Sequence, residues 1–345
     1  MEYLTERLRD GRDLAPEDIG AATDALVDES VSREEKAAFL EALSAKGETA
    51  AEIAAFANEF LERAVDPGLD REAVGKPLLD VCGTGGDKLN LFNVSTASVF
   101  PLAAAGIAVV KHGNRGITSR SGGADVLEAL GIRIDLSPGD CCRCLDQVGA
   151  AFLFAPLYHP AFKAVGPVRK LLAERGRRTM FNLLGPLLNP VRPDYQLVGV
   201  FDAAVGPVFS DILDRLGRRR AWVVYGTTGD GAGMDELSTL GHTRIWSTDE
   251  AGTSGATIDP ATLHLSPATL ADLQGGDAGE NARILTAILD GSLTGPKRDI
   301  VALNAAAALA VAGKAGDLHE GLALANETID SGAALHVLHR WRQFS

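Results

Sequence analysis

The chain has 345 residues, of which 46% are hydrophobic and 23% charged, and its formal net charge is −13. This composition is typical of a globular protein with room for one large and one small domain. It argues against nucleic-acid binding, because an acidic chain repels phosphate backbones, and no apolar run is long enough to span a membrane. We therefore expect no nucleic-acid or membrane partner, and any phosphate ligand must be held by a local basic cluster.

The first part of the chain, residues 1 to about 72, has the pattern of helices only. Ser32 to Glu35 and Thr49 to Glu52 are S/T-x-x-E capping boxes, which mark helix starts. After the second box, apolar side chains at helical spacing form one face: Ile53, Phe56 and Phe60. We expect a small helical subdomain over residues 1–72. The charged beginning, MEYLTERLRDGRD, is unlike a signal peptide, so we expect a cytoplasmic protein.

From Leu78 onward, short apolar runs alternate with helical patterns, as in parallel α/β folds. The segment from about 160 to 190 interrupts this alternation with a helix expected over Val165–Glu174. The expected fold is α/β: a small all-helical N-terminal subdomain plus a large α/β domain, residues 75–159 and 191–345, with a mostly parallel central sheet. Late helices are expected over Ile300–Ala312 and Leu318–Ile329. The candidate strands are Leu78–Val81, Ile107–Val110, Phe152–Ala155, Gln196–Phe201 and Ala221–Tyr225.

Two of these apolar runs lead directly into glycine-rich polar turns. Leu78–Val81 precedes GTGGD at residues 83–87, and Ile107–Val110 precedes KHGNR at residues 111–115. Glycines let the backbone approach a ligand, and exposed N–H groups with the dipole of the following helix favour phosphate. Two such turns close together in the chain indicate a ligand that carries more than one phosphate.

Polar side chains beside the turns are candidate ligand contacts. After the first turn, Asn93 and Thr96 can donate to ribose or phosphate, and Ser95 can offer a hydroxyl to a metal ion. The same NVST stretch can also be a helix N-cap cluster, and the two interpretations are compatible. After the second turn, Lys111 is a point charge suited to phosphate. Hydroxyls then precede a helix expected over Ala124–Leu130, at Thr118, Ser119 and Ser121.

Asp235 and Glu236 form an adjacent carboxylate pair inside a glycine-bounded loop, GDGAGMDELS. Magnesium commonly takes one or two carboxylates together with phosphates of its ligand. Neighbours on a regular strand point to opposite faces, so both can reach one site only from an irregular turn, which the glycines allow. Acid pairs are common on surfaces, but together with Ser95 and a pyrophosphate this pair is a candidate site for two magnesium ions.

Six motifs occur in the order found in one enzyme family: GTGGD, NVST, KHGNR, HPAFKAVGPVRK, RTMFNLLGPLLNP and GMDELST. On these motifs the chain resembles the anthranilate phosphoribosyltransferases. The resemblance implies magnesium-dependent transfer of the phosphoribosyl group from phosphoribosyl pyrophosphate to the amine of anthranilate, with release of pyrophosphate, in tryptophan biosynthesis. It also implies that the segment at about 160–190 returns to the helical subdomain and walls the cleft, and that this subdomain forms the contact of a homodimer.

The resemblance also implies three sets of site residues. The metal would be bound by Ser95, Asp235 and Glu236. The acceptor would be contacted by Gly83, Asn114, His159, Arg169, Gly185 and Pro186. The donor would be contacted by Gly83, Gly86, Asp87, Asn93, Ser95, Thr96, Lys111, His112, Gly113, Asn114, Arg115, Thr118, Ser119 and Gly123.

No catalytic residue follows with certainty from these motifs. His112 and His159 can equally be hydrogen-bonding or packing histidines, and the aromatic amine of anthranilate is largely unprotonated at neutral pH, so a strong general base is not required. Arg169 matches the arginine that binds the carboxylate of anthranilate, a contact that suits a guanidinium fork. Only the motif separates Arg169 from its basic neighbours Lys170, Arg175, Arg177 and Arg178.

The chain departs from the family pattern on the donor side. Lys88 stands where glycine is usual and Leu91 where a hydroxyl residue is usual, and Gly116, Arg120 and Gly123 replace a small side chain, a lysine and a serine. Three other functions therefore stay open: a paralogue with another acceptor, a pyrimidine-nucleoside phosphorylase, and a non-catalytic phosphoribosyl-ligand binder. The KHGNR motif argues against the phosphorylase, and the intact lysine and acid pair argue against the binder.

The four cysteines do not form a metal motif. Cys141, Cys142 and Cys144 form CCRC, which lacks the C-x2-C spacing of zinc sites. We interpret them as thiols in a reducing compartment. Cys82 lies beside the first glycine turn and is interpreted as a small apolar filler.

Overall fold

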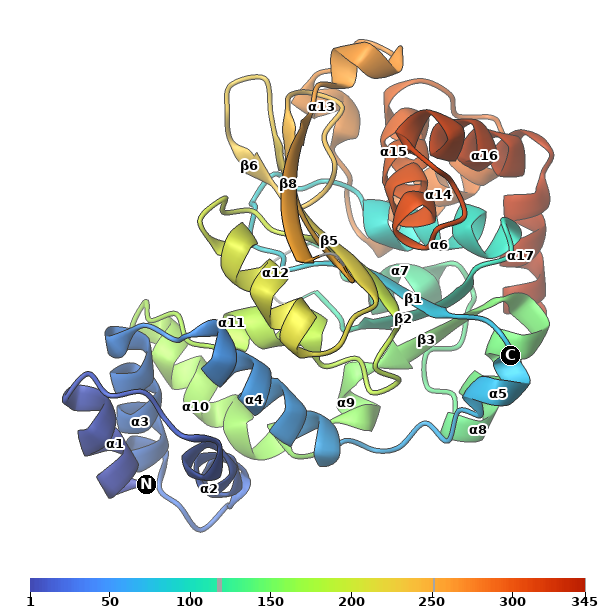
Figure 1. Cartoon of the computed structure of the whole chain (residues 1–345). Coiled ribbons are helices and arrows are strands. Elements are labelled where there is room, and N and C mark those ends of the chain that lie inside the picture. The colour runs from blue at the N-terminus through green and yellow to red at the C-terminus, as the bar shows by residue number, and fades with distance from the viewer. Residues whose placement is uncertain (117–119, 251, 345) are drawn as a thin grey trace.

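The computed structural model describes residues 1–116, 120–250 and 252–344. Figure 1 shows a helical part at the lower left and an α/β part above and to the right of it. Two helices from the middle of the chain, α10 (Phe162–Glu174) and α11 (Phe181–Leu184), lie with the N-terminal helices, and α10 contacts α2 and α3. The N-terminal helices are α1 (Glu2–Arg9), α2 (Pro16–Val27), α3 (Arg33–Lys46) and α4 (Ala50–Glu62), and α5 (Arg71–Val74) follows them.

Both predicted capping boxes are confirmed. The side chain of Ser32 accepts a hydrogen bond from the backbone N–H of Glu35, and that of Thr49 accepts one from the backbone N–H of Glu52. The apolar face predicted behind the second box is buried and packs on α10, since the rings of Phe60 and Phe162 lie 4.8 Å apart.

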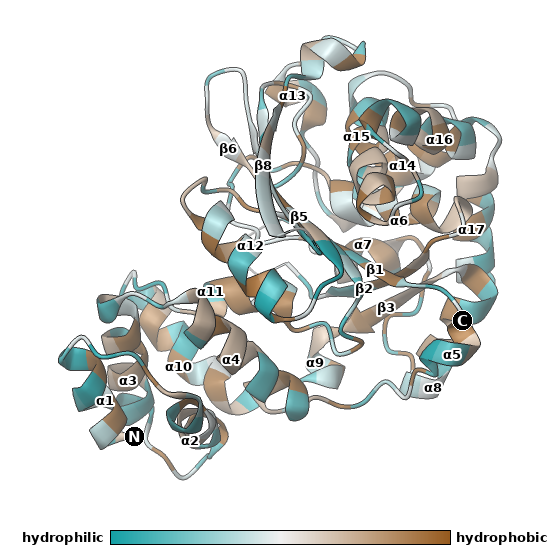
Figure 2. Ribbon diagram, in the orientation of Figure 1, coloured by the Kyte–Doolittle hydropathy of each residue, from teal (hydrophilic) through white to brown (hydrophobic). Residues whose placement is uncertain are grey.

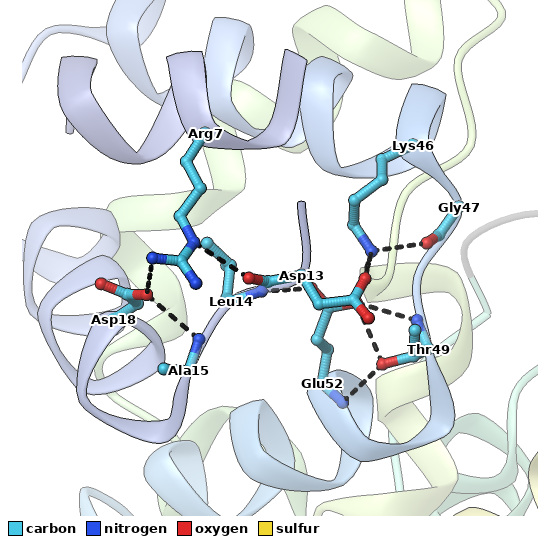
Figure 3. Close-up of polar contacts among 9 residues, drawn as sticks. All are labelled: Arg7, Asp13, Leu14, Ala15, Asp18, Lys46, Gly47, Thr49 and Glu52. Atoms are coloured by element: carbon cyan, nitrogen blue, oxygen red, sulfur yellow. Dashed lines mark hydrogen bonds and ion pairs between the residues drawn. The ribbon is translucent and has the colours of Figure 1, made fainter. Parts of the chain in front are cut away.

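Glu52 is a buried carboxylate that ties two turns of the helical part together (Figure 3). Its oxygens accept hydrogen bonds from the backbone N–H of Leu14 at 3.0 Å and from Lys46 Nζ at 2.8 Å. Lys46 Nζ also donates to Asp13 at 2.6 Å. A buried charge is stable only when it is paired and hydrogen-bonded, so this network fixes the α1–α2 loop against the α3–α4 turn.

The α/β part is built on a sheet whose strand order, within the described residues, is β3-β2-β1-β4-β5-β7-β8, with β6 paired to β5. The strands β1 to β5 pair in parallel, and β6, β7 and β8 pair antiparallel to their neighbours. This confirms the predicted fold class. The strands are β1 (Leu78–Gly83), β2 (Ala108–Gly113), β3 (Ala150–Phe154), β4 (Tyr195–Gly199), β5 (Arg220–Thr227), β6 (Gly233–Met234), β7 (Thr243–Asp249) and β8 (Gly252–Ile258).

The strands β1 to β5 lie within a few residues of the five predicted strands, whereas the antiparallel strands β6, β7 and β8 were not predicted. β8 reads GTSGATI, and its side chains are almost all exposed, so it lacks the apolar run that marks a buried strand. In Figure 2 the strands β1 to β3 are mostly apolar, whereas β8 is pale. Edge strands of this kind are specified by pairing with a neighbour more than by their own composition.

Helices cover both faces of the sheet and enclose two apolar cores. Leu197 and Val224 point into the core formed with α6 and α15, whereas Val198 and Val223 point into the core formed with α12 and the helical part. Among the described helices, none is both long and apolar enough to cross a membrane. The longer helices are α6 (Val94–Ala104), α7 (Gly123–Ala129), α8 (Pro138–Val148), α12 (Val205–Arg215), α14 (Ala278–Leu289), α15 (Pro296–Val311), α16 (Leu318–Asp330) and α17 (Ala333–Gln343). Single turns are α9 (Ala155–Tyr158), η1 (Gly185–Leu187), η2 (Pro260–Leu263) and α13 (Leu270–Leu273).

The thiols of the CCRC motif lie on α8 and pack within the α/β part. Cys141 accepts a hydrogen bond from the hydroxyl of Tyr158 at 3.2 Å, and Cys144 donates to the carbonyl of Ala150 at 3.3 Å. Burial raises the pKa of Cys144 to about 12 and also raises the pKa of Cys82, so both thiols stay protonated and unreactive.

Candidate active site

The two glycine-rich turns leave the same edge of the sheet. β1 and β2 are adjacent parallel strands, so GTGGD at the end of β1 and KHGNR at the end of β2 lie side by side. Lys111 Nζ donates to the carbonyl of Val81 at 2.5 Å, which joins the two strand ends directly. Ligands of open α/β sheets bind at this edge, where the carboxyl ends of the strands meet.

The GTGGD turn needs its glycines for conformation and for close approach. Gly85 and Gly86 have φ of 70° and 94°, a region that favours glycine. The Gly85 N–H donates to Asp235 Oδ2 at 2.7 Å. A Cβ on Gly83 would lie 2.3 Å from the same carboxylate oxygen. The turn is thus closed against the predicted metal-binding loop.

Asp235 and Glu236 follow the short strand β6 and are half-buried. Burial and the nearby charge of Asp87 raise the pKa of Asp235 to about 7. Burial and the charge of Asp235 hold the pKa of Glu236 well above its usual value. A bound divalent cation would stabilise the ionised form of these two crowded carboxylates. Asp235 and Glu236 are therefore suitable ligands for Mg²⁺. Among the described residues there is no set of three His, Cys, Asp or Glu side chains arranged to hold a metal by themselves.

Ser95 and Lys111 connect the loop of Asp235 and Glu236 to the second glycine turn. The Ser95 N–H donates to Glu236 Oε1 at 3.1 Å, and Lys111 Nζ lies 3.2 Å from the Ser95 hydroxyl, to which it donates. Lys111 is 4% exposed, so it is held in place rather than flexible. Ser95, Lys111 and Glu236 therefore form one contiguous group, as a shared role in binding a metal–phosphate complex requires.

The remainder of the KHGNR turn is organised by carboxylates of α7. Arg115 forms ion pairs with Asp125 and Glu128. The other oxygen of Asp125 accepts hydrogen bonds from the N–H groups of Gly116 and Gly122. Both Nη atoms of Arg115 already donate to these carboxylates. Asn114 is exposed beside it, and the predicted donor residues Thr118 and Ser119 lie outside the described residues.

Three more predicted donor residues lie close to this group. A Cβ on Gly123 would lie 3.1 Å from the Thr96 hydroxyl and 3.6 Å from Cε of Lys111, which places Gly123 over both side chains. Asn93 uses its side chain for structure: it donates to the carbonyl of Ser121 and accepts from Asn281. The helix starts of α6 and α7 are thereby joined.

On the acceptor side, a chain of ring contacts runs from β2 into the helical part. The rings of His112 and His159 lie 5.2 Å apart, and His159 in turn contacts Phe162 at 5.6 Å. Phe162 contacts Phe181, and the guanidinium of Arg169 lies 5.5 Å from the Phe181 ring centroid. These side chains, from His112 to Arg169, form what we call the acceptor wall. It is aromatic at one end and cationic at the other, which suits a flat, aromatic carboxylate.

The two histidines are held neutral. Burial lowers the pKa of His112 to about 3, and burial also lowers the pKa of His159. His159 Nε2 lies 2.7 Å from the carbonyl of Leu188, so Nε2 carries the proton and donates. His112 Nε2 is buried and has no hydrogen-bond partner among the described residues. Both imidazoles can bind a ligand, but His112 is a poor base.

Arg169 has no carboxylate partner among the residues that the structure describes. Within the described residues its side chain makes no hydrogen bond or ion pair, and burial lowers its pKa without making it neutral. Nearby, the predicted acceptor residues Gly185 and Pro186 form the single turn η1, and the Pro186 carbonyl accepts a hydrogen bond from Gln196 at 2.6 Å. An acceptor carboxylate would supply the missing partner for Arg169.

These features coincide with similarity to known proteins over almost the whole chain. Residues 75–335 match a glycosyl transferase family, a/b domain, and residues 2–64 match the helical bundle domain of the same family. An anthranilate phosphoribosyltransferase of Methanocorpusculum labreanum is 47% identical over 87% of this chain and 85% of its own length. The chain belongs to the anthranilate phosphoribosyltransferase family.

Solved members of the anthranilate phosphoribosyltransferase family share the fold. The Thermus thermophilus structure superposes with a TM-score of 0.89 and 40% identity, and covers 99% of this chain and 98% of its own. The Saccharomyces cerevisiae enzyme in complex with PRPP and Mg superposes with a TM-score of 0.86 and 27% identity, and covers 99% and 97%. The yeast enzyme has also been solved in complex with 4-fluoroanthranilate.

The departures from the pattern of the anthranilate phosphoribosyltransferase family have visible structural correlates. Leu91 is half-buried against the α/β core and forms a bridge to Gln274, so it packs where a hydroxyl is usual. A serine at position 123 would crowd Thr96, which fits the glycine found there. Lys88 is exposed at a φ of 59°. Gly116 and Arg120 are exposed as well.

Several supporting residues escaped the sequence analysis. Asn304, a buried polar residue in the alanine-rich α15, accepts from the N–H of Leu237 and donates to its carbonyl, which fixes the backbone after Glu236. A Cβ on Gly199 would lie 1.6 Å from the Asp235 carbonyl. The available signals were a lone asparagine within NAAAALAVA and a glycine at a strand end.

Proposed function

We propose that this chain transfers the phosphoribosyl group of phosphoribosyl pyrophosphate to the amine of anthranilate and releases pyrophosphate, a step of tryptophan biosynthesis. The observation that carries this proposal is the 47% identity to a curated anthranilate phosphoribosyltransferase over most of both chains. It is supported by the paired glycine turns on the donor side and by the aromatic and cationic wall on the acceptor side.

On the donor side, the proposed contacts are the backbone of the GTGGD turn and the group around Lys111. Gly85 and Gly86 are exposed at the carboxyl end of β1; the Gly85 N–H is taken by Asp235, so the proposed pyrophosphate contact from this pair is the Gly86 backbone. Lys111 and Ser95 already touch one another, so they can bind a metal–phosphate complex without large rearrangement. The remaining proposed donor contacts are Gly83, Asp87, Asn93, Thr96, His112, Gly113, Asn114, Arg115, Thr118, Ser119 and Gly123.

We propose that Ser95, Asp235 and Glu236 hold two magnesium ions together with the pyrophosphate. The support is the convergence of Asp87, Asp235 and Glu236, in which burial, and after it the nearby negative charges, raise the pKa values of the last two. Magnesium would neutralise the negative charge that develops on the leaving pyrophosphate. The chain itself contributes the fixed geometry: Gly85 orients Asp235, and Ser95 orients Glu236, each through a backbone N–H.

On the acceptor side, Arg169 binds the carboxylate of anthranilate in our proposal, and His159, Gly83, Asn114, Gly185 and Pro186 line the ring. Holding the amine in line with ribose C1 turns a bimolecular encounter into an intramolecular one. The C1–nitrogen bond forms as the C1–oxygen bond to pyrophosphate breaks, and the amine then loses one proton. His112, with a pKa of about 3, is too weak a base to hold that proton, so we assign it a contact role.

A homodimer through the helical subdomain and a cytoplasmic location complete the proposal. All four cysteines are free thiols, which fits a reducing compartment.

The direct test is a fluorescence assay with purified protein, anthranilate, phosphoribosyl pyrophosphate and Mg²⁺. We expect anthranilate fluorescence to fall with time, and one pyrophosphate to be released for each anthranilate consumed. Unchanged fluorescence over a wide range of both substrates, with the protein folded, would refute the proposal. Release of a base from a nucleoside in the presence of phosphate would point to a phosphorylase instead.

Replacing Gly83 with alanine tests the link between the first glycine turn and the metal-binding loop. The new Cβ would lie 2.3 Å from Asp235 Oδ2, so the carboxylate must move. We expect kcat/KM to fall roughly tenfold to a hundredfold, because small misplacements of binding groups have effects of this size. A magnesium titration of turnover should show a weaker apparent affinity. Gly139→Ala, where a Cβ meets nothing within 4 Å, is the control.

A further inference from the structure

Arg178 is one residue that contacts both parts of the molecule. It lies between α10 and α11, and its backbone carbonyl accepts a hydrogen bond from the Ser44 hydroxyl on α3 at 3.0 Å. Its guanidinium lies 5.1 Å from the ring centroid of Phe201, which follows β4. The backbone of Arg178 thus belongs to the helical part, whereas its charge lies on the α/β part.

The segment that carries Arg178 is held in place on both sides. Arg175 pairs with Glu41 of α3 at 3.1 Å, and the N–H of Thr179 donates to Asn182 Oδ1 at 2.9 Å. The same segment leads from Arg169 on α10 to Phe181 on α11, the two residues that end the acceptor wall. Arg178 is therefore fixed relative to the acceptor side of the site.

Phe201 places the guanidinium of Arg178 next to the GTGGD turn. A Cβ on Gly86 would lie 3.2 Å from a carbon of the Phe201 ring, so ring and turn are in direct contact. The guanidinium and the backbone that we propose binds pyrophosphate therefore contact the same ring. Cation–π contacts at exposed sites are weak enough to be exchanged for a phosphate, which the long arginine side chain can approach by rotation.

Among the cations around the turns, Arg178 and Lys88 differ from Lys111 and Arg115 because their side chains make no hydrogen bond or ion pair in the described part of the chain. Lys111 is already bonded to Val81 and Ser95, and Arg115 is paired with Asp125 and Glu128. The side chain of Arg178 has no hydrogen bond or ion pair within residues 1–116, 120–250 and 252–344. The chain is acidic overall and three carboxylates converge beside this turn, so a bound pyrophosphate needs positive charge from the protein.

We propose that Arg178 is a donor-binding residue that contacts the pyrophosphate group from the acceptor side of the site, and that Phe201 holds its guanidinium when no ligand is bound. This inference rests on the proposed function for the identity of the ligand. In this proposal the segment from Arg169 to Phe181 contacts both substrates: Arg169 binds the acceptor and Arg178 binds the pyrophosphate of the donor.

The test uses the full-length protein with Arg178→Gln, Arg178→Lys and a matched control, Arg177→Gln. Arg177 is the exposed neighbour, and its side chain makes no hydrogen bond or ion pair within the described residues. The dissociation constant of pyrophosphate in the presence of Mg²⁺ is measured by calorimetry, and KM for each substrate by the fluorescence assay. We expect Arg178→Gln to weaken pyrophosphate binding about tenfold and to raise KM for phosphoribosyl pyrophosphate by a similar factor. Arg178→Lys should recover part of this loss, and Arg177→Gln should match the wild type.

The acceptor supplies the internal control. KM for anthranilate, measured at saturating donor, should change less than about twofold in Arg178→Gln, because the contact is to the donor. Equal pyrophosphate affinity in Arg178→Gln and Arg177→Gln overturns the inference, and so does a proportional rise in both KM values with a lower melting temperature, which would indicate a structural brace. Pyrophosphate calorimetry does not depend on turnover, so a wild-type protein that binds pyrophosphate without consuming anthranilate would refute the proposed function alone.

Discussion

The double substitution Asp235→Asn and Glu236→Gln is expected to lower kcat/KM about a thousandfold, which corresponds to roughly 4 kcal/mol of lost transition-state stabilisation. The two carboxylates converge with Asp87 at the GTGGD turn, and burial and mutual repulsion raise both of their pKa values. Amides of the same shape carry no charge and bind Mg²⁺ poorly. A fluorescence assay across a magnesium series should show loss of saturation in the millimolar range.

Stability separates a metal-binding role from a structural one. Asparagine and glutamine keep the oxygens that accept from Gly85 and Ser95 and remove charges that burial disfavours. The melting temperature of the variant without ligands should therefore equal or exceed that of the wild type, whereas its rise on adding donor and Mg²⁺ should vanish. Asp230 lies in the same loop, and its carboxylate accepts a hydrogen bond from the Thr228 hydroxyl. Asp230→Asn is therefore the matched control and should keep normal magnesium dependence. A double variant with unchanged magnesium dependence would remove these residues from the metal site.

Arg169→Ala is expected to raise KM for anthranilate about thirtyfold, or roughly 2 kcal/mol, and to change KM for phosphoribosyl pyrophosphate less than about threefold. The guanidinium lies against Phe181 at the end of the aromatic wall and has no carboxylate partner in the described part of the chain. Its removal deletes a charge-assisted hydrogen bond to the acceptor and leaves the donor contacts in place. Lys170→Ala, at the exposed neighbouring position, serves as the control.

The acceptor itself offers a second measurement on Arg169. Aniline has the reacting amine and the ring of anthranilate but no carboxylate. The wild type should prefer anthranilate over aniline strongly, and Arg169→Ala should shrink that preference by about the factor by which it raises KM for anthranilate. If the variant keeps the full preference, another group binds the carboxylate and the assignment is wrong.

Local sequence patterns predicted the features of this fold that local chemistry determines. The boxes at Ser32 and Thr49 are helix starts because a side chain three residues away completes each cap. The five parallel strands are largely buried and so appear as apolar runs, and the GTGGD turn carries glycines because Gly85 and Gly86 adopt positive φ.

Contacts between distant segments were beyond such patterns. Nothing near Lys111 in the sequence shows that its ammonium group is held by Val81 and Ser95, and nothing near Arg115 separates a phosphate ligand from a partner of Glu128. Asn304 lies far along the chain from the loop that it fixes. These residues could be identified only after the sheet had brought the segments together, because their partners are set by tertiary contacts.

The helix α12 has a consequence for how the molecule can move. It packs on α4 of the helical part and on β5 and β7 of the sheet, and the apolar core on this side runs without interruption from Phe56 through Ile212 to Val223. Swinging the helical part away as a rigid lid would expose this core to water. Relative movement during turnover should therefore take the form of shear, with packed helices sliding over one another by small steps while their side chains stay interdigitated.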